Sequence, residues 1–241
     1  MDRLWPYFPK SRGRARVDDR RVLSGIIFIN RNSLRWCDAP SEYGLPKTPY
    51  NRWQRWSDMG VFARIMMGLA EQVPDNKAIS IDATYLKAHR TASSLGLKKR
   101  GRGRLIGQTK GGMNTKLHAV TDTRGRPVRF FITAGQVSDY AGAAALLNGL
   151  PEADWLLADR GYDAGWFREG RIDTGTRPCI PGQKSRKTTI KYDKRRYKRR
   201  NRIKRMFSRI KDWRRVAKRY DRSPTVFLSA IILAATVIFW L

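Results

Sequence analysis

Apolar residues recur at helical spacing over residues 1–75 of the chain. The stretches 20–31 and 60–69 each carry an apolar stripe that is typical of a helix packed on one side. Between them a helix is predicted to begin at Pro49, because Thr48 can cap it and proline suits a first helical position. Short helices with arginines near a helix start fit a helix-turn-helix, and a helical lid with an aromatic core is the alternative interpretation.

The pattern changes to that of strands after residue 77. Residues 78–83 alternate between apolar and polar side chains, and further short apolar segments follow along the chain. Residues 121–127 contain a glycine and connect two of these segments as a hairpin, while residues 140–150 have the composition of a helix. Strands joined first by hairpins and then by helices predict an α/β fold with a mixed sheet. The predicted strands cover residues 78–83, 116–120, 128–133, 155–158 and 176–180.

Two segments are too basic to form a core by themselves. Residues 87–112 contain lysine, arginine and glycine but no acidic residue, and residues 182–200 are almost as basic. Both are therefore expected to be basic loops. Beyond the second segment Ile203, Met206 and Ile210 recur at helical spacing, which predicts a packed helix.

The overall charge indicates a polyanionic partner. The 241 residues include 50 Lys or Arg and 20 Asp or Glu, which gives a formal net charge of +30. Solubility needs far less, about 2–8 charges for a small domain. Nucleic acid is the partner that fits best, and an anionic membrane surface is the weaker alternative. A wholly disordered polycation is excluded, because 41% of the residues are hydrophobic.

The uncharged apolar segment 225–241 has two interpretations. Its length lies at the lower edge of what crosses a bilayer, about 17–25 residues, so it is either a membrane anchor or a buried helix with Pro224 in its first turn. Cys37 and Cys179 lie far apart in the sequence and form no metal or redox motif. Together with an N-terminus unlike a signal peptide, this favours a reduced, cytoplasmic chain.

Two aspartates each follow a predicted apolar strand, Asp82 after residues 79–81 and Asp159 after residues 155–158. Adjacent strand ends can bring two carboxylates to one cation, and hard oxygen ligands suit Mg²⁺ or Mn²⁺. Phosphoryl transfer on DNA uses such ions to activate the attacking oxygen and to stabilise the leaving one. The plain alternative is that each aspartate caps a turn. Asp139 either supports such a site or caps the following helix.

Longer motifs cover nearly all of the chain. They include Tyr-Asn-Arg-Trp-Gln-Arg-Trp at 50–56, Ile-Asp-Ala-Thr-Tyr-Leu-Lys-Ala-His-Arg at 81–90, Thr-Lys-Gly-Gly-Met-Asn-Thr-Lys-Leu-His-Ala at 109–119 and Leu-Ala-Asp-Arg-Gly-Tyr-Asp at 157–163. Together they resemble the DDE transposases of bacterial insertion sequences, in the family numbered five. The resemblance implies an RNase-H-like mixed five-stranded sheet with flanking helices over 76–241, preceded by a small all-α helix-turn-helix domain over 1–75. It also favours the buried helix for the C-terminal segment.

The resemblance also implies a set of site residues. Asp82 and Asp159 match the first two catalytic acids, which hold two Mg²⁺ or Mn²⁺ ions in active relatives. The family's third motif is Tyr, two residues, Arg, three residues, Glu, six residues, Lys. It falls on Tyr197, Arg200, position 204 and Lys211, and its Tyr, Arg and Lys resemble contacts to DNA ends. Position 204 is Lys204 where the family has glutamate, so a third metal-binding carboxylate is missing and catalysis is expected to be impaired.

By this resemblance the partner is double-stranded DNA, at the ends of the transposon and at its target, and the location is the nucleoid-containing cytoplasm, with no membrane. A water frees a 3′-hydroxyl at the transposon end, and this hydroxyl attacks target DNA in a complex of two or more copies. Two other functions stay open, a non-catalytic DNA-binding remnant or regulator of transposition and a membrane-anchored basic protein. Further DNA contacts are expected at Arg52, Arg55, Lys98, Lys99, Arg100, Arg102 and Arg104.

Overall fold

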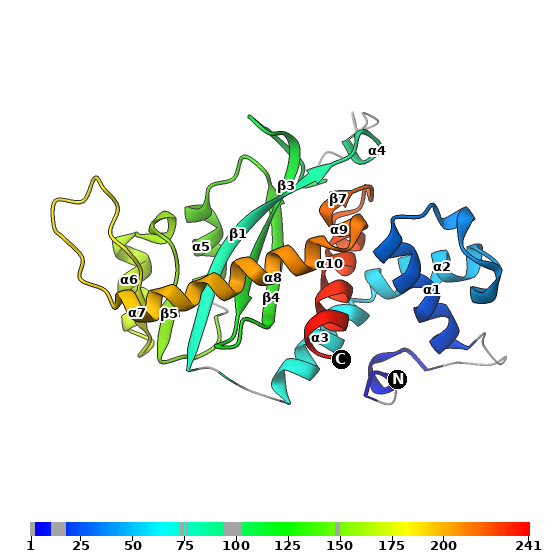
Figure 1. Cartoon of the computed structure of the whole chain (residues 1–241), viewed down its shortest axis with the longest axis horizontal. Coiled ribbons are helices and arrows are strands. Elements are labelled where there is room, and N and C mark those ends of the chain that lie inside the picture. The colour runs from blue at the N-terminus through cyan, green and yellow to red at the C-terminus, as the bar shows by residue number, and fades with distance from the viewer. Residues whose placement is uncertain (1–2, 11–17, 73–74, 76, 94–102, 148–149) are drawn as a thin grey trace. The chain divides into compact units, whose positions relative to one another are not determined.

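The computed structural model describes residues 3–10, 18–72, 75, 77–93, 103–147 and 150–241 (Figure 1). The chain folds into two compact units, each assembled from separate stretches of sequence. Unit 1 comprises Met1–Gln72, Lys87–Arg104 and Arg209–Leu241, and unit 2 comprises Val73–Leu86 and Leu105–Ser208. The two ends of the chain therefore share one unit, and the segments with Asp82 and Asp159 share the other.

Unit 1 is built from helices. The longer ones are α1 (Asp19–Asn32), α2 (Lys47–Asp58), α3 (Val61–Glu71) and α10 (Pro224–Phe239). The shorter ones are η1 (Trp5–Tyr7), η2 (Trp36–Asp38), η3 (Ser41–Tyr43), α4 (Arg90–Ser93) and α9 (Arg214–Ala217). Trp53 and Trp56 of α2 are fully buried, so they belong to the core. Gly60 makes the turn between α2 and α3 with a φ of +65°, a left-handed conformation that favours glycine. The predicted helices of this region are confirmed, and their DNA-binding role stays a prediction.

The uncharged C-terminal segment forms α10. Ser223 caps this helix by accepting a hydrogen bond from the Val226 N–H at 3.4 Å, and Pro224 occupies the first turn as predicted. The helix packs against α1, α2, α3 and α9 within unit 1, and its residues from Val226 to Thr236 are mostly buried. In the part of the chain that the structure describes, no helix is long and apolar enough to cross a membrane.

Unit 2 is built on a mixed sheet. Its strands are β1 (Ala78–Ala88), β2 (Gly107–Thr109), β3 (Gly112–Thr121), β4 (Pro127–Ala134), β5 (Trp155–Leu157) and β6 (Arg177–Cys179). The order across the sheet is β2-β3-β1-β5-β6, and β4 also pairs with β3. β5 runs parallel to β1 and β6, whereas β3 runs antiparallel to β2 and β4. The five predicted strands correspond to β1, β3, β4, β5 and β6, which confirms the fold class.

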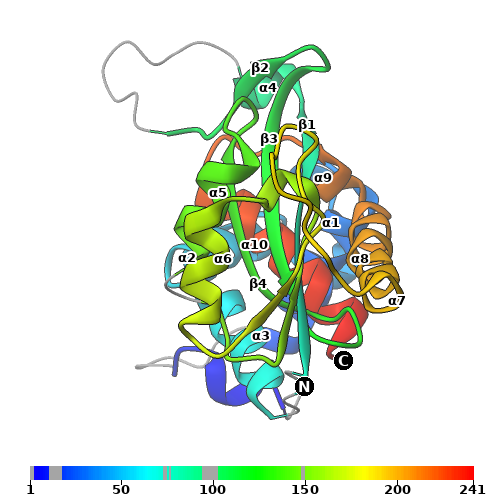
Figure 2. The same cartoon turned by 90° about the vertical axis from the view of Figure 1, so that its left-hand side faces the viewer.

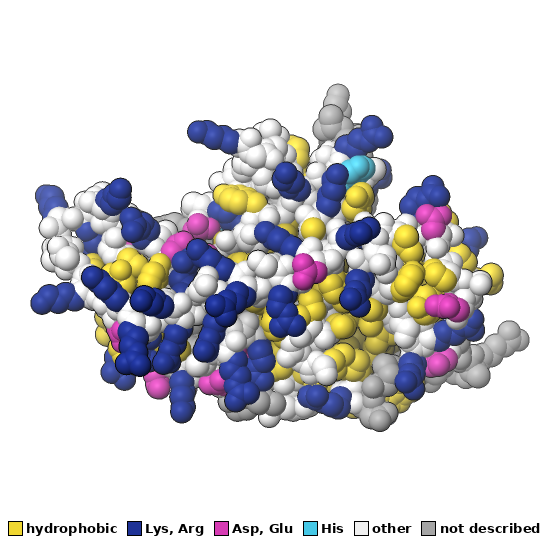
Figure 3. Space-filling view, in the orientation of Figure 1, with side chains coloured by type: hydrophobic (Ala, Val, Ile, Leu, Met, Phe, Trp, Pro, Cys, Tyr) yellow, Lys and Arg dark blue, Asp and Glu magenta, His cyan; other side chains and the backbone are white. Residues whose placement is uncertain are grey.

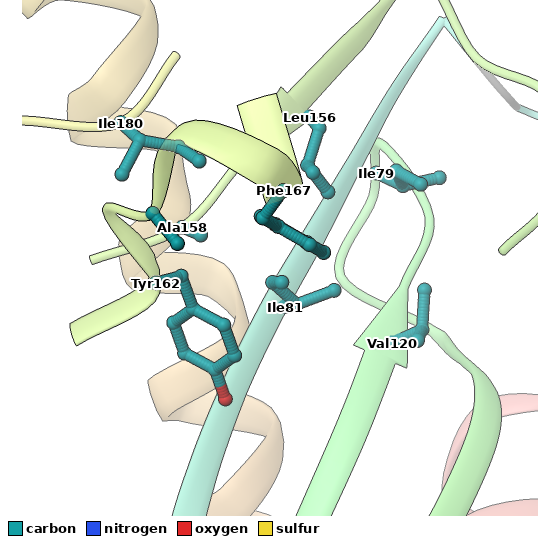
Figure 4. Close-up of a cluster of buried hydrophobic side chains, with 9 residues drawn as sticks. Ile79, Ile81, Val120, Leu156, Ala158, Tyr162, Phe167 and Ile180 are labelled. Atoms are coloured by element: carbon teal, nitrogen blue, oxygen red, sulfur yellow. The ribbon is translucent and has the colours of Figure 1, made fainter. Parts of the chain in front are cut away.

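Successive side chains of β1 point to opposite faces of the sheet. Ile79 and Ile81 join Leu156 and Phe167 in a buried apolar cluster on one face (Figure 4). The helices α5 (Asp139–Leu147) and α6 (Gly165–Ile172) lie on one side of the sheet, and α7 (Lys194–Tyr197), η5 (Lys198–Arg200) and α8 (Asn201–Lys211) lie on the other (Figure 2). Phe167 belongs to α6, so Asp82, which follows Ile81, faces the side of α7 and α8.

The two predicted basic loops are shorter than expected. Within 87–112 the strand β1 continues to Ala88, because its end pairs in parallel with β7 (Lys218–Arg219), and α4 and β2 also form there. Residues 94–102 of this predicted loop lie outside the described residues. The loop over 182–200 ends at Asp193, whose Oδ1 accepts the Arg196 N–H at 2.8 Å and caps α7. Both corrections come from interactions that composition alone does not show.

Candidate active site

Asp82 and Asp159 stand side by side on neighbouring parallel strands. The register of β1 and β5, continued by two residues beyond the paired segment, sets Asp82 opposite Asp159. Each aspartate uses its Oδ1 to accept a backbone N–H, from Ala83 at 2.9 Å and from Gly161 at 2.8 Å. These two hydrogen bonds orient both carboxylates and leave both Oδ2 atoms for another partner.

Arg200 is that shared partner. Its Nη2 lies 2.8 Å from Asp82 Oδ2 and 3.1 Å from Asp159 Oδ2. Both Oδ2 atoms are therefore hydrogen-bonded to the same nitrogen atom. Arg200 ends η5, and its side chain is only 10% exposed. Asp82 is similarly buried, whereas the Asp159 side chain is 34% exposed, so solvent reaches the cluster on the Asp159 side. The structure thus brings together the two aspartates that the sequence singles out.

Burial shapes the electrostatics of this cluster. It raises the pKa of Asp82 above its ordinary value, and the Arg200 guanidinium opposes that rise. The Tyr162 hydroxyl is buried and has no hydrogen-bond partner among the described residues. Its pKa is well above the ordinary value because of burial and then of three nearby aspartates, of which Asp139 acts most strongly. Figure 4 shows this hydroxyl pointing away from the apolar cluster. A surplus of acidic groups in a poorly hydrated place favours a cation.

Lys204 does not take the position between the carboxylates. Its side chain is exposed, four residues beyond Arg200, which is about 40° further round the helix and one turn along it. Tyr197 is half-buried, and its ring centre lies 5.9 Å from the Arg200 guanidinium. Lys211 belongs to unit 1, where burial lowers the pKa of its ammonium. The cation beside the aspartates is therefore Arg200, which the sequence motif assigns to DNA contacts.

A third aspartate lies beside Asp159. A Cβ atom added to Gly161 would lie 2.9 Å from Asp159 Oδ1 and 3.5 Å from Asp139 Oδ2, so both carboxylates approach Gly161. Lys116 fixes Asp139 in this place, with its Nζ 3.1 Å from Asp139 Oδ1 and 2.7 Å from the Val137 carbonyl oxygen. The sequence pattern treats Lys116 as an ordinary strand residue. A lysine within an apolar strand, here 4% exposed, is the signal that could have marked it.

The surroundings of Asp139 decide between its two interpretations. Asp139 is the first residue of α5, and the Ser138 Oγ accepts the Ala141 N–H at 3.2 Å. Ser138 therefore caps this helix. Asp139 is left as a neighbour of the Asp82–Asp159 pair, held by a buried ammonium group.

Two consecutive parts of the sequence each match a family of known proteins. Residues 74–239 match the family described as "Transposase DDE domain". The chain belongs to the DDE transposase family. Residues 1–66 match a second family, described as "Putative transposase of IS4/5 family". The predicted resemblance is confirmed at the level of the IS4/5 group of DDE transposases.

Individual relatives of this DDE transposase family member agree. A Brucella ovis protein named "Putative transposase for insertion sequence element IS6501" is 36% identical over 132 residues, which are 54% of this chain and 99% of that protein. A Burkholderia cepacia protein named "Insertion element IS402 uncharacterized 16.2 kDa protein" is 30% identical and covers 39% of this chain and 77% of its own length. The solved structure of a piggyBac transposase synaptic complex with hairpin DNA has a TM-score of 0.51 at 9% identity, over 98% of this chain and 68% of that chain. This likeness shows the shared RNase-H-like fold.

The carboxylate pair of this DDE transposase chain fits a hard divalent cation. Mg²⁺ is often held by one or two carboxylates and completes its shell with water and phosphate oxygens. Asp82 and Asp159 present two such oxygens to one point, where a cationic nitrogen of Arg200 already lies. Within the described part of the chain, no group of three or more His, Cys, Asp or Glu side chains is arranged to hold a metal. The acidic groups that this arrangement offers to a metal are therefore the two aspartates of the pair, while the nearby Asp139 is paired with Lys116.

Basic side chains follow the helix that carries Arg200. Figure 3 shows Lys and Arg gathered along α7, η5 and the beginning of α8. Because a dense row of cations matches the phosphate backbone of DNA, this surface is the natural candidate for a nucleic-acid contact. The exposed members in unit 2 are Lys194, Arg195, Lys198, Arg199, Arg202, Lys204 and Arg205.

Those other predicted DNA contacts that the structure describes lie in unit 1. Arg55 is exposed, whereas Arg52 lies 3.4 Å from the buried carboxylate of Asp19 and stacks near Trp56. Arg104 donates a hydrogen bond to the Ala92 carbonyl oxygen at 3.1 Å. Arg52 therefore has a structural role whether or not it also meets DNA. Lys98, Lys99, Arg100 and Arg102 lie outside the described residues.

Proposed function

We propose that this chain is the transposase of a bacterial insertion sequence, and that its Lys204 impairs catalysis. It binds the terminal inverted repeats of its element as double-stranded DNA, in an assembly of at least two copies. Its reaction is metal-dependent cleavage at those ends, followed by transfer of the freed 3′-hydroxyl to target DNA. The membership of the chain in the DDE transposase family supports this proposal.

One observation carries the proposal. Asp82 and Asp159 direct their Oδ2 atoms to a single cationic nitrogen at the junction of two parallel strands. Asp159 does cap the turn η4 (Arg160–Tyr162) through the Gly161 N–H, but capping does not account for the convergence of both Oδ2 atoms on one nitrogen. A pair of carboxylates aimed at one positive charge is the arrangement that divalent-ion chemistry on phosphodiesters requires.

Each group near the pair has a separate task in this reaction. Asp82 and Asp159 would hold the divalent ion, and the N–H groups of Ala83 and Gly161 keep their carboxylates in orientation. When bound, such an ion polarises the phosphodiester and lowers the pKa of an attacking water. The exposed basic residues of α7, η5 and α8 would hold the DNA backbone without reading its sequence. The chain's own contribution is therefore positioning and charge compensation.

The impairment follows from charge at position 204. Lys204 lies on the same side of the helix as Arg200, within about 40°. A glutamate there could reach toward the pair and add a third negative ligand, whereas a lysine adds a positive charge and no ligand. The exposed lysine is compatible with the fold, so we expect DNA binding to survive where catalysis is weakened.

Strand cleavage tests both parts of the proposal. Duplex DNA carrying the ends of the encoding element is incubated with Mg²⁺ and either the natural chain or Lys204→Glu. We expect weak or no cleavage by the natural chain and clear cleavage by Lys204→Glu. The matched control is Arg205→Glu, which makes the same change of charge at an exposed position of the same helix and is expected not to increase cleavage.

The alternative functions give different results in the same assay. A non-catalytic DNA-binding regulator would bind the ends in a gel-shift assay but would stay inactive after Lys204→Glu. Equal and robust cleavage by the natural chain and by Lys204→Glu would contradict the impairment while keeping the transposase. Loss of specific binding to the ends would contradict the transposase itself.

A further inference from the structure

We propose that Arg200 is the resident cation of the Asp82–Asp159 pair, and that a divalent ion binds only by displacing it. The inference rests on the proposed function, because it assigns to that site a competitor for its metal. Arg200 Nη2 already occupies the position that a metal would need, 2.8 Å from Asp82 Oδ2 and 3.1 Å from Asp159 Oδ2. A guanidinium and a divalent ion cannot both fill that point.

The position of Arg200 follows from charge compensation. Asp82 is 8% exposed, and the burial of its carboxylate beside the partly exposed carboxylate of Asp159 is unfavourable without a counter-charge. Arg200 comes from a helix on the facing side of the sheet and supplies the missing positive charge. In the absence of metal, its guanidinium therefore stabilises the folded state by placing a positive charge between the two carboxyl groups.

The contacts of Arg200 are incomplete for a permanent ion pair. Its Nε is buried and has no hydrogen-bond partner among the described residues. A buried donor that has no partner is unfavourable, because it has lost its hydrogen bonds to water and gained none in return. Both aspartates are oriented by backbone N–H groups of Ala83 and Gly161 rather than by Arg200. The carboxylates are therefore kept in place when the guanidinium leaves, which is what an exchange of cations requires.

Lys204 biases this competition toward Arg200. The two carboxylates of the pair balance a divalent ion, and the guanidinium must then leave, since the nearby third carboxylate, Asp139, is already paired with the Lys116 ammonium. Glutamate at position 204 would add negative charge one turn from Arg200 and so favour the divalent ion. Lysine instead of glutamate at position 204 therefore removes a ligand and also shifts the preference of the pair from a divalent ion toward the Arg200 guanidinium.

Manganese binding to the full chain tests the competition without any DNA. Mn²⁺ is titrated into the natural chain and into Arg200→Gln, and free Mn²⁺ is followed by electron paramagnetic resonance. We expect Arg200→Gln to bind Mn²⁺ on the order of tenfold more tightly. Adding Asp82→Asn to Arg200→Gln is expected to abolish the gain, which locates the ion at the pair. Arg199→Gln, which removes a neighbouring exposed charge, controls for the general effect of a less basic protein and is expected to bind as the natural chain does.

Thermal unfolding gives an independent readout. In a chelator, Arg200→Gln is expected to melt at a lower temperature than Arg199→Gln, and Mn²⁺ is expected to restore its stability more than that of the natural chain. If Arg200→Gln does not fold, Arg200→Lys replaces it. The shorter ammonium is expected to hold the pair less well, so the gain in Mn²⁺ affinity is smaller but has the same sign.

Unchanged Mn²⁺ affinity in Arg200→Gln, or an equal gain in Arg199→Gln, would overturn the inference. A gain that persists after Asp82→Asn would also overturn it, because the ion would then bind elsewhere. Failure of the proposed function has a different signature, which is absent cleavage and absent end binding in Lys204→Glu. The two results are measured on different variants and by different methods, so either can fail alone.

Discussion

The backbone N–H of Gly161 donates a hydrogen bond to Asp159 Oδ1, at 2.8 Å. A Cβ added to the same glycine would lie 2.9 Å from that oxygen, too close unless the carboxylate moves, and 3.5 Å from Asp139 Oδ2, which is an ordinary contact. Gly161 therefore orients the carboxylate of the catalytic candidate Asp159 in two ways, through the hydrogen bond from its N–H and through the absence of a side chain. A methyl group here would press on the Asp159 carboxylate.

The first prediction concerns Gly161→Ala. We expect the methyl group to turn the Asp159 carboxylate away from its place opposite Asp82, while the fold persists because the short acidic side chain can move. In the Arg200→Gln background, the added Gly161→Ala is expected to weaken Mn²⁺ binding on the order of tenfold. The matched control is Gly165→Ala in the same background, since a Cβ at Gly165 would make only an ordinary contact at 3.9 Å to Glu169. Equal Mn²⁺ affinity in both double variants would show that Gly161 does not orient Asp159.

The second prediction concerns the buried ammonium of Lys116. In Lys116→Met, Asp139 and the Val137 carbonyl oxygen lose their partner, and we expect the free energy of unfolding to fall by about 1–3 kcal/mol. The value lies at the low end for a buried pair because the Asp139 side chain is 36% exposed and water can replace part of the contact. Urea unfolding measures the change. Lys110→Met, at an exposed position, is expected to change stability by less than about 0.5 kcal/mol.

A double-mutant cycle with Asp139→Asn completes that test. If Lys116 and Asp139 stabilise each other, the loss in the double variant is smaller than the sum of the two single losses by about 0.5–1 kcal/mol. Strictly additive losses would show that Lys116 acts through packing alone.

The sequence predicts the position of Asp82 at this site but not that of Arg200 beside it. Alternation along residues 78–83 correctly predicts a strand that ends its apolar part at Asp82, and the apolar run 155–158 does the same for Asp159. The residue that joins them is distant in sequence, and its burial depends on which side of the sheet its helix covers. A run of basic residues is typical of a solvated surface. The neighbouring sequence therefore does not distinguish the buried Arg200 from the exposed Arg199.

The same limit applies to the smaller elements. β7 and the end of β1 form strands only because they pair with each other. Their residues are too polar to be recognised from pattern alone. The helix α7 begins inside a predicted basic loop, where Asp193 supplies the cap, and a single capping residue is a weak signal within a run of charges.

The third prediction is a pH dependence that originates at His118. This histidine is fully buried, lies 3.0 Å from Thr133 Oγ1 and stacks on Phe131. Burial lowers its pKa from 6.5 to about 4. The unfolded chain therefore binds a proton at a pH where the folded chain does not, so this group reduces stability as the pH falls from 6.5 toward 4. The full effect amounts to about 3 kcal/mol.

Unfolding measurements at several pH values in this window check the third prediction. His118→Gln is expected to be less stable than the natural chain at pH 7 but to lose less of its stability on acidification. Because both proteins contain the same carboxylates, the difference between their two pH dependences reports on His118. The control is His89→Gln, at the other of the two histidines, which leaves His118 in place and so keeps its acid-induced loss. An identical dependence on pH in the natural chain and His118→Gln would rule out His118 as its source.

The last prediction concerns Asp163, which ends the motif that contains Asp159. Its carboxylate is fully buried and accepts hydrogen bonds from Arg168 at 2.6 Å, from Arg186 at 2.8 Å and from the Gln183 N–H at 2.7 Å. Burial by itself would raise the pKa of Asp163, but these three donors hold it below the ordinary value. The carboxylate therefore ties the segment after β6 to α6.

In Asp163→Asn the shape is kept, but two arginines lose their shared negative partner. We expect a loss of about 2–4 kcal/mol in the free energy of unfolding, measured in urea, because breaking a buried ion pair leaves charge uncompensated. Asp173→Asn removes a carboxylate at an exposed position and is expected to change stability by less than about 0.5 kcal/mol. We also expect faster proteolysis within residues 181–190 of Asp163→Asn, since that segment loses its anchor. If both variants were equally stable and equally resistant, the segment would be held by other contacts, and the motif's second aspartate would have no structural role.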